Sequence, residues 1–179
     1  MTDLRLDYTL CFLTRGDAVL MLHRLRPPNR GLWNGVGGHI EADESPLAAC
    51  LREVREETGY RLHEARFAGL LTWTGFETAD GGVYLFTAQA PQGEPAACPE
   101  GALRWQPRSW LLSSAEVVSN IRHYGPEVLA GGGPAAPSLR IPRRRNPALL
   151  GRGVAARAAS RVRCAPTWSR RPPRGRGSA

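Results

Sequence analysis

Runs of apolar residues, some alternating with polar ones, predict several strands in the first 110 residues. Apolar runs flank the RGD tripeptide within residues 8–22, and Gly16 supplies the positive φ that a tight hairpin needs. Residues 66–76 and 82–90 repeat this pattern around a polar, glycine-containing turn, and residues 102–105 form a further short strand. The pattern predicts two antiparallel strand pairs and one additional strand.

A different periodicity predicts a helix over about residues 46–58. Four apolar positions fall at spacings of 3, 4 and 7, which places them on one helical face. They are Leu47, Cys50, Leu51 and Val54. Ser45 before Pro46 is a favourable N-terminal cap, and Gly59 can take the left-handed conformation that ends a helix.

A second helix, either straight or kinked, is predicted over about residues 113–129. Ser113 and Glu116 have the spacing of a capping box, so the helix should start there and run towards Leu129, where glycines 131–133 end it. Residues 23–33 contain two prolines and a glycine and are predicted to be a loop. The order of elements predicts an α/β fold, with helices packed on a mixed or largely antiparallel sheet.

The charge divides the 179 residues into two parts. All 24 basic residues are arginines: residues 1–131 hold 12 of them with all 16 acidic residues, and residues 132–179 hold the other 12 with no acid. We therefore predict an acidic domain of net charge −4 and a tail of +12. The Arg, Pro, Gly and Ala bias of the tail is typical of disorder, or of a GC-rich gene read in a shifted frame.

The cysteines and the N-terminal residues indicate the compartment. No two of the four cysteines have CxxC spacing, so neither a zinc site nor a disulfide framework is predicted. No apolar stretch is long enough to cross a bilayer, and residues 1–10 do not have the pattern of a signal peptide. We expect a cytoplasmic protein that does not associate with membranes.

The predicted helix carries an unusual concentration of acid. Glu53, Glu56 and Glu57 are neighbours at i, i+3 and i+4, where unpaired like charges cost about 0.2–0.5 kcal/mol per pair. Arg52 and Arg55 could neutralise them as a salt-bridged surface. A divalent cation is the alternative, because clustered carboxylates suit Mg²⁺ or Mn²⁺.

The glycines at 35, 37 and 38, just upstream, can bring backbone groups close to an ion or a phosphate. From this point the sequence resembles the Nudix box: a glycine, five residues, Glu, seven residues, then Arg-Glu-aliphatic-x-Glu-Glu-x-Gly-aliphatic. The matching positions are Gly38, Glu44, Arg52, Glu53, Val54, Glu56, Glu57 and Gly59. Tyr60 replaces the final aliphatic residue, at a packing position.

The resemblance covers about residues 5–130 and implies a Nudix α/β/α sandwich with a mixed sheet and a loop-helix-loop catalytic box. In such enzymes bound Mg²⁺ helps a carboxylate activate water for attack on a diphosphate. The implied metal ligands are Glu53, Glu56, Glu57 and the carbonyl of Gly37. Arg52 would orient the glutamates and Glu44 would brace the loop; the general base stays open. Glu100 is a further candidate ligand, or else an exposed loop acid.

The residues around the box resemble those of MutT-like 8-oxo-dGTP diphosphatases, with His39 where lysine is frequent. Asn34 could read a purine edge or serve the turn before Gly35, and Trp33 could pack against a base or anchor the loop. Asn120 could likewise read a base or cap a helix.

Further contacts are expected with the phosphates. Arg24 and Arg30 flank the entrance to the box and could hold phosphate oxygens, and Gly38 could bring its backbone close to them. The leading expectation is a Mg²⁺-dependent hydrolase that converts a nucleoside triphosphate to the monophosphate and pyrophosphate, as a monomer or homodimer. The alternatives are another nucleoside diphosphate derivative such as ADP-ribose, or a catalytically silent binding module whose basic tail binds nucleic acid.

Overall fold

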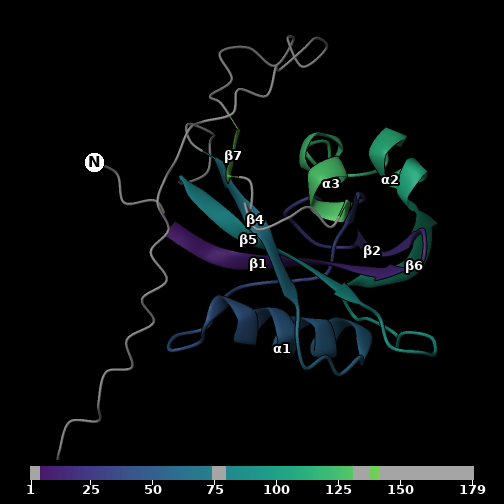
Figure 1. Ribbon diagram of the computed structural model, residues 1–179, viewed down its shortest axis with the longest axis horizontal. Coiled ribbons are helices and arrows are strands. Elements are labelled where there is room, and N and C mark those ends of the chain that lie inside the picture. The colour runs from purple at the N-terminus through teal and green to yellow at the C-terminus, as the bar shows by residue number, and fades with distance from the viewer. Residues whose placement is uncertain (1–4, 74–79, 131–137, 142–179) are drawn as a thin grey trace, which may run out of the picture. The chain divides into compact units, whose positions relative to one another are not determined.

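The described residues form one mixed sheet of seven strands, in the order β3-β2-β1-β5-β4-β7, with β6 pairing along β2 (Figure 1). A computed structural model describes residues 5–73 and 80–130 and the backbone of residues 138–141. The strands are β1 (Arg5–Arg15), β2 (Ala18–Arg24), β3 (Trp33–Asn34), β4 (Arg66–Trp73), β5 (Gly81–Gln89), β6 (Gly101–Pro107) and β7 (Ser138–Ile141).

The predicted strand pairs are confirmed. β1 and β2 form an antiparallel hairpin with Gly16 at a φ of +58°, and β4 pairs antiparallel with β5. The sheet is mixed because β1 runs parallel to β5, and β4 runs parallel to β7. β1 therefore lies inside the sheet, between β2 and β5.

Helices cover both faces of this sheet (Figure 1). Alternate residues of β1 point to opposite faces, as the period of a strand requires. Cys11 and Leu13 pack in the cluster beneath α1 (Pro46–Thr58). Leu10 and Phe12 pack in the cluster beneath α2 (Arg108–Ser113) and α3 (Ile121–Leu129). The predicted α/β/α sandwich is confirmed.

Both predicted ends of α1 are confirmed. The Ser45 side chain accepts a hydrogen bond from the Ala48 amide at 3.1 Å, which satisfies one of the free donors at the helix start. Gly59 adopts a φ of +74°, and its amide donates to the Arg55 carbonyl at 2.9 Å. Glycine suits this position because it takes the left-handed conformation without a Cβ penalty.

The apolar face of α1 differs from the predicted stripe at two positions, because Leu47 is exposed and Leu51 is only partly buried. Cys50 and Val54 are fully buried against the sheet, as predicted. Leu47 is 40 % exposed, and Ala49 is buried in the same part of the helix. The stripe therefore starts two residues later than the spacing indicated.

The helix predicted from Ser113 to Leu129 starts in the wrong place, because residues 114–120 are not helical; its end is confirmed, since α3 stops at Leu129. Ser113 is the last residue of α2, and its hydroxyl donates to the Ser109 carbonyl rather than capping a new helix. The intervening backbone pairs with Trp33: the Trp33 amide donates to the Glu116 carbonyl at 2.8 Å, and the Val118 amide donates to the Trp33 carbonyl at 3.0 Å. These backbone groups are used in a bridge between distant segments, so the helix breaks there.

Strand β7 lies beyond the boundary predicted at residue 131. Its residues 138–141 pair in parallel with residues 70–73 of β4, so the sheet extends into the segment assigned to the tail. Residues 142–179 of that tail lie outside the described residues. Among the helices that are described, none has the length and apolarity to cross a membrane.

Candidate active site

Arg52 is the hub of the acidic side of α1. A guanidinium has five N–H donors, and all five are used here. They reach Glu44 Oε1 (3.0 Å) and Oε2 (2.9 Å), Glu53 Oε1 (2.8 Å), Glu56 Oε2 (3.2 Å) and the His39 carbonyl (2.9 Å). The bonds from Arg52 hold the pKa of Glu44 below its ordinary value, and those from Glu44 and Glu53 raise the pKa of Arg52. Arg52 thus ties the helix to the preceding loop and has no donor left over.

Glu57 is the buried member of the acidic group. Its side chain is only 4 % exposed, and its Oε2 accepts a hydrogen bond from the Gly37 amide at 2.7 Å. The pKa of Glu57 is raised to about 8, mainly by burial; the charges of Glu100 and Glu53 contribute to the rise, and the Gly37 hydrogen bond and the charge of Arg24 oppose it. Burial also raises the pKa of Glu53. Both carboxylates are therefore poorly compensated in their charged form.

Gly37 and Gly38 allow the loop to pack directly on α1. Gly37 has a φ of +146°, and a Cβ there would overlap the backbone of Thr9. A Cβ on Gly38 would lie 2.5 Å from Oε1 of Glu53, closer than real contacts allow. The glycines of the box are thus required by the close approach of the loop to the carboxylates and to β1.

Glu100 faces the same region from the start of β6. Its Oε2 lies 3.6 Å from Nη2 of Arg24, and its carbonyl accepts a hydrogen bond from the Leu25 amide at 2.9 Å. Its charge raises the pKa of both Glu53 and Glu57, so the three carboxylates lie close enough to interact. Residues 47 positions apart in the chain meet here.

The oxygen donors fit a hard divalent cation in kind, since carboxylates that repel one another gain from a cation between them. They do not form a closed shell: in the described part of the chain, no three His, Cys, Asp or Glu side chains converge to hold a metal ion. The reason is visible in the contacts, because Glu53 and Glu56 turn towards Arg52 and Glu57 turns towards Gly37. Binding of a cation would require these carboxylates to reorient.

The two arginines predicted to hold phosphates differ in their surroundings. Arg24 is only 15 % exposed in its side chain; its Nε donates to the Pro28 carbonyl at 3.0 Å, and its guanidinium faces Glu100. Arg30 is exposed in the loop between β2 and β3. Arg24 therefore neutralises part of the acidic region, and Arg30 is the more accessible cation.

Of the two roles predicted for each of Trp33 and Asn34, the contacts in the structure match the structural one. Trp33 is buried in the core between His23 and Trp110, with ring centroids 4.9 and 6.0 Å away. The Asn34 Oδ1 accepts a hydrogen bond from the Gly35 amide at 2.9 Å. Trp33 anchors the loop and Asn34 stabilises the turn that follows.

Asn120 does not cap α3 through its side chain, which was one of its two predicted roles. It lies at the N-terminal cap position of α3, but its side chain makes no capping hydrogen bond. Its Oδ1 is buried and has no hydrogen-bond partner among the described residues. A buried acceptor without a partner is unfavourable, so Oδ1 of Asn120 would gain from a hydrogen-bond donor.

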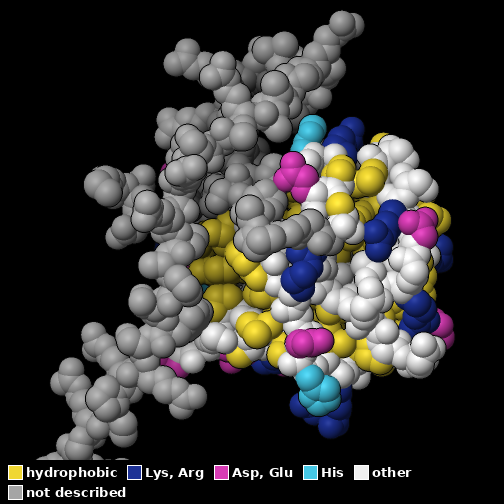
Figure 2. All heavy atoms as spheres, viewed as in Figure 1, with side chains coloured by type: hydrophobic (Ala, Val, Ile, Leu, Met, Phe, Trp, Pro, Cys, Tyr) yellow, Lys and Arg dark blue, Asp and Glu magenta, His cyan; other side chains and the backbone are white. Residues whose placement is uncertain are grey.

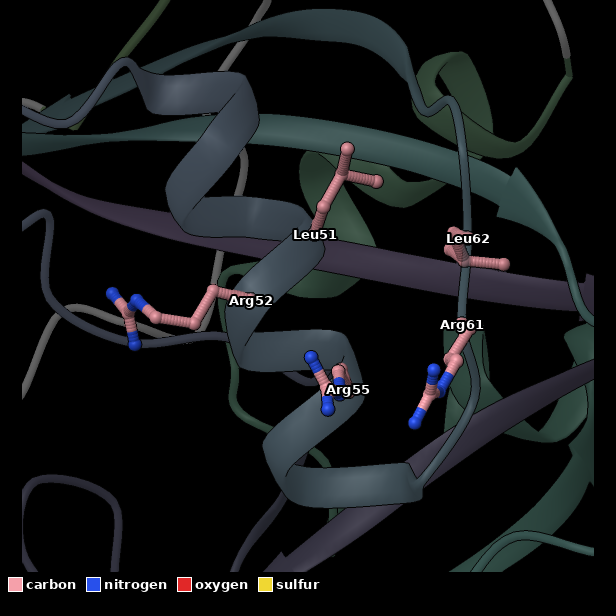
Figure 3. Close-up of a pocket in the computed structure, with 5 residues that line it drawn as sticks. All are labelled: Leu51, Arg52, Arg55, Arg61 and Leu62. Carbon is pink, nitrogen blue, oxygen red and sulfur yellow. The ribbon is translucent and has the colours of Figure 1, made fainter.

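A surface pocket of about 260 Å³ lies on another side of α1 (Figure 3). It is lined by Leu51, Arg52, Arg55, Arg61 and Leu62. Figure 3 shows the Arg52 guanidinium extending away from Arg55 and Arg61. No carboxylate lines this pocket, which separates it from the predicted metal ligands.

Comparison with known proteins bears on this arrangement of loop, acidic helix and sandwich. The sequence profile described as NUDIX domain matches residues 4–126, more than half of the chain. The chain belongs to the Nudix family. Two curated relatives of this Nudix chain are the uncharacterized Nudix hydrolase YvcI of Bacillus subtilis, 33 % identical over 105 residues, and the oxidized purine nucleoside triphosphate hydrolase of Danio rerio, 31 % identical over 98 residues.

Each curated alignment covers 54 % of this Nudix chain and 63 % of the relative, so the chain spans less than two thirds of their length. Among solved structures, the MutT protein of Bacillus halodurans is 28 % identical with a TM-score of 0.55, over 68 % of this chain and 77 % of that one. The MutT protein of Methanosarcina mazei has a TM-score of 0.63 at 18 % identity, over 73 % and 97 % of the two chains, which shows the shared fold alone.

Sequence reasoning missed two contacts of this Nudix box. The His39 carbonyl completes the donors of Arg52, and Gly38 lies directly against the Glu53 carboxylate. Both contacts involve the backbone, and the side chain of His39 says nothing about where its carbonyl points. Only the glycine at position 38 gave a signal, since glycine marks positions of close backbone approach.

Proposed function

We propose that this Nudix domain is a divalent-metal-dependent hydrolase that converts nucleoside triphosphates to monophosphates and pyrophosphate, and that it acts on oxidised purine nucleotides such as 8-oxo-dGTP. The observation that carries the proposal is the acidic side of α1, where Arg52 and Gly37 hold three glutamates beside Glu100. The similarity to the oxidized purine nucleoside triphosphate hydrolase of Danio rerio supports the substrate class.

In this proposal Glu53, Glu56, Glu57, Glu100 and the Gly37 carbonyl hold Mg²⁺ or Mn²⁺. A bound divalent ion would supply Lewis acidity and neutralise the diphosphate of the substrate. The protein itself orients the carboxylates through Arg52, whose charge and geometry hold them on the loop side of the helix. The buried position of Glu57 excludes water from one side of the group.

Asn120 supplies the base contact in this proposal. A buried acceptor without a partner gains most from a ligand that brings a donor, because the cost of its burial is then removed. The oxidised base 8-oxoguanine carries an N–H at position 7, where guanine has only a lone pair. Oδ1 of Asn120 therefore offers a means of favouring the oxidised base.

The test is pyrophosphate release with Mg²⁺ across normal and oxidised nucleoside triphosphates and ADP-ribose. Glu57→Gln keeps the shape of the side chain and removes its charge, so turnover should fall about 10²–10⁴-fold. Glu64→Gln, at an exposed position outside the box, is the matched control and should retain turnover. Faster hydrolysis of ADP-ribose than of every triphosphate would replace the substrate class, and no turnover at all would refute the proposal.

Any binding of nucleic acid is assigned in this proposal to residues 132–179. Figure 2 shows acidic and basic side chains interspersed over the described part of the face in view, whereas residues 132–179 hold 12 arginines and no acid. Binding through this segment should weaken steeply as salt rises, because counterions are released when phosphates are neutralised. Retention of DNA affinity by a chain that ends at Ile141 would contradict the assignment.

A further inference from the structure

The last residue of the Nudix box, Tyr60, holds the end of α1 to a distant loop. The Tyr60 hydroxyl donates to the Gly93 carbonyl at 2.7 Å. Nη2 of Arg15 lies within donor distance of the Tyr60 hydroxyl (3.2 Å), the Gly93 carbonyl (2.6 Å) and the Pro91 carbonyl (2.8 Å). We refer to Arg15, Tyr60, Pro91 and Gly93 as the clasp.

Both side chains of the clasp are constrained by packing. Tyr60 is only 7 % exposed and lies in the core cluster beneath α1. The guanidinium of Arg15 stacks over the Trp105 ring, 4.3 Å from its centroid, and forms an ion pair with Glu94 at 3.5 Å. The donors of the clasp are therefore aimed by their surroundings, and they fix the backbone of the loop.

Packing alone does not require the hydroxyl of Tyr60. The Nudix pattern has an aliphatic residue at this position, which would fill the same apolar cluster. A buried phenol needs a hydrogen-bond partner, and here the partner is a loop carbonyl. The substitution thus adds a specific bond to a position that otherwise serves only the core.

The loop that the clasp holds connects the two ends of the acidic region. Three residues after Gly93, the Ala96 amide donates to the Thr58 carbonyl at 2.8 Å. Thr58 directly follows Glu57 in the helix. Beyond it, the loop ends at Glu100, whose charge acts on Glu57. Residues 90–100 therefore run from the clasp, past the end of α1, to the opposite carboxylate.

We propose that Tyr60, held by Arg15, is a positioning residue that fixes the end of α1 against the loop and so sets the separation of Glu57 and Glu100. This inference rests on the proposed function, because it assigns both carboxylates to one divalent-cation site. Loss of the clasp lets the two carboxylates drift apart and weakens cation binding, while the chemical step at saturating cation is largely retained.

The test measures Mn²⁺ binding to the full chain without nucleotide. The free Mn²⁺ is quantified by electron paramagnetic resonance. Tyr60→Phe removes only the hydroxyl, and we expect about three- to tenfold weaker binding, the size of effect that the loss of one hydrogen bond predicts. In turnover, the Mg²⁺ concentration for half-maximal rate should rise by the same factor with little change in kcat. Tyr84→Phe, which removes a phenol outside the clasp, is the matched control.

A double-variant cycle separates positioning from general loosening of the fold. In a Glu100→Gln background, Tyr60→Phe should weaken Mn²⁺ binding no further, because the carboxylate that the clasp positions has lost its charge. Arg15→Lys keeps the charge but loses the planar fork, so it should reproduce the effect of Tyr60→Phe.

Two results would overturn the inference alone: wild-type Mn²⁺ affinity in Tyr60→Phe, or an equal further loss in the Glu100→Gln background. A wild-type chain that binds no Mn²⁺ would instead refute the metal site of the proposed function, and the role of the clasp with it. The two failures are distinguished by whether the wild-type protein binds the ion.

Discussion

Gly38→Ala should damage the site through a single contact. A Cβ at this position would lie 2.5 Å from Oε1, 2.6 Å from Cδ and 2.7 Å from Oε2 of Glu53. Gly38 is not among the residues with positive φ, so alanine is compatible with its backbone conformation. The whole effect of the substitution should therefore come from the overlap with the carboxylate.

The size of the effect follows from the distance. Real Cβ contacts begin near 3.0 Å and become ordinary near 3.4 Å, so the carboxylate must retreat by about 0.5–0.9 Å. That retreat disturbs the 2.8 Å ion pair between Glu53 and Arg52. A misplacement of this order costs about 10–100-fold in kcat. Because the overlap is with the far end of a flexible side chain, the loss of stability lies at the low end of the range for overpacking, about 1 kcal/mol, or a Tm lower by roughly 3 °C.

Turnover at saturating Mg²⁺ and thermal denaturation check the two effects separately. The decisive control is a Glu53→Ala background, in which the added methyl group meets no carboxylate. There Gly38→Ala should lower neither kcat nor Tm further, because the two changes act through one contact. Wild-type turnover in Gly38→Ala, or an equal loss of Tm in the Glu53→Ala background, would refute the reasoning.

Three further predictions concern the hub, the buried acid and the unpaired amide. Arg52→Lys should lower kcat about 10–100-fold, since three donors on a flexible stem cannot replace a five-donor fork. Arg55→Lys, on the same helix, should leave kcat unchanged. Steady-state kinetics of both variants test this prediction. Without divalent ions the folded protein keeps a proton on Glu57, whose pKa of about 8 lies above the ordinary 4.5. The Tm should therefore fall as the pH rises from about 4.5 to 8, and a slope unchanged in Glu57→Gln would contradict this. Asn120→Leu removes a buried acceptor without a partner, so the Tm should stay level or rise while kcat/KM for 8-oxo-dGTP falls at least about tenfold; a Tm lower by several degrees would assign the amide a structural role.

The features that could be predicted from the sequence depend on neighbours within one element. The ends of α1 follow from Ser45 and Gly59, because caps are decided by residues within one turn of the helix end. The position of the glutamates on one side of α1 follows from helical spacing in the same way. The alternation of β1 between two core clusters follows from the period of a strand.

The features that could not be predicted depend on contacts between distant segments. The break between α2 and α3 arises because the backbone around Val117 pairs with Trp33, more than 80 residues earlier. The same pairing buries Trp33, which from its type alone could equally have faced a base. Propensity and capping patterns contain no information on such pairings, and tertiary contacts override them.

Strand β1 serves as a partition between two sets of functions. Phe12 supports the layer that carries Asn120, and its neighbour Leu13 supports the layer that carries the glutamates. Adjacent residues of one strand thus support two different helical layers, one on each face of the sheet. Under the proposed function, in which Asn120 contacts the base, substitutions on the α2 and α3 side would change the preferred base while the acidic helix on the other face stays unchanged. Directed evolution of specificity should accordingly concentrate its libraries on the α3 side of the partition.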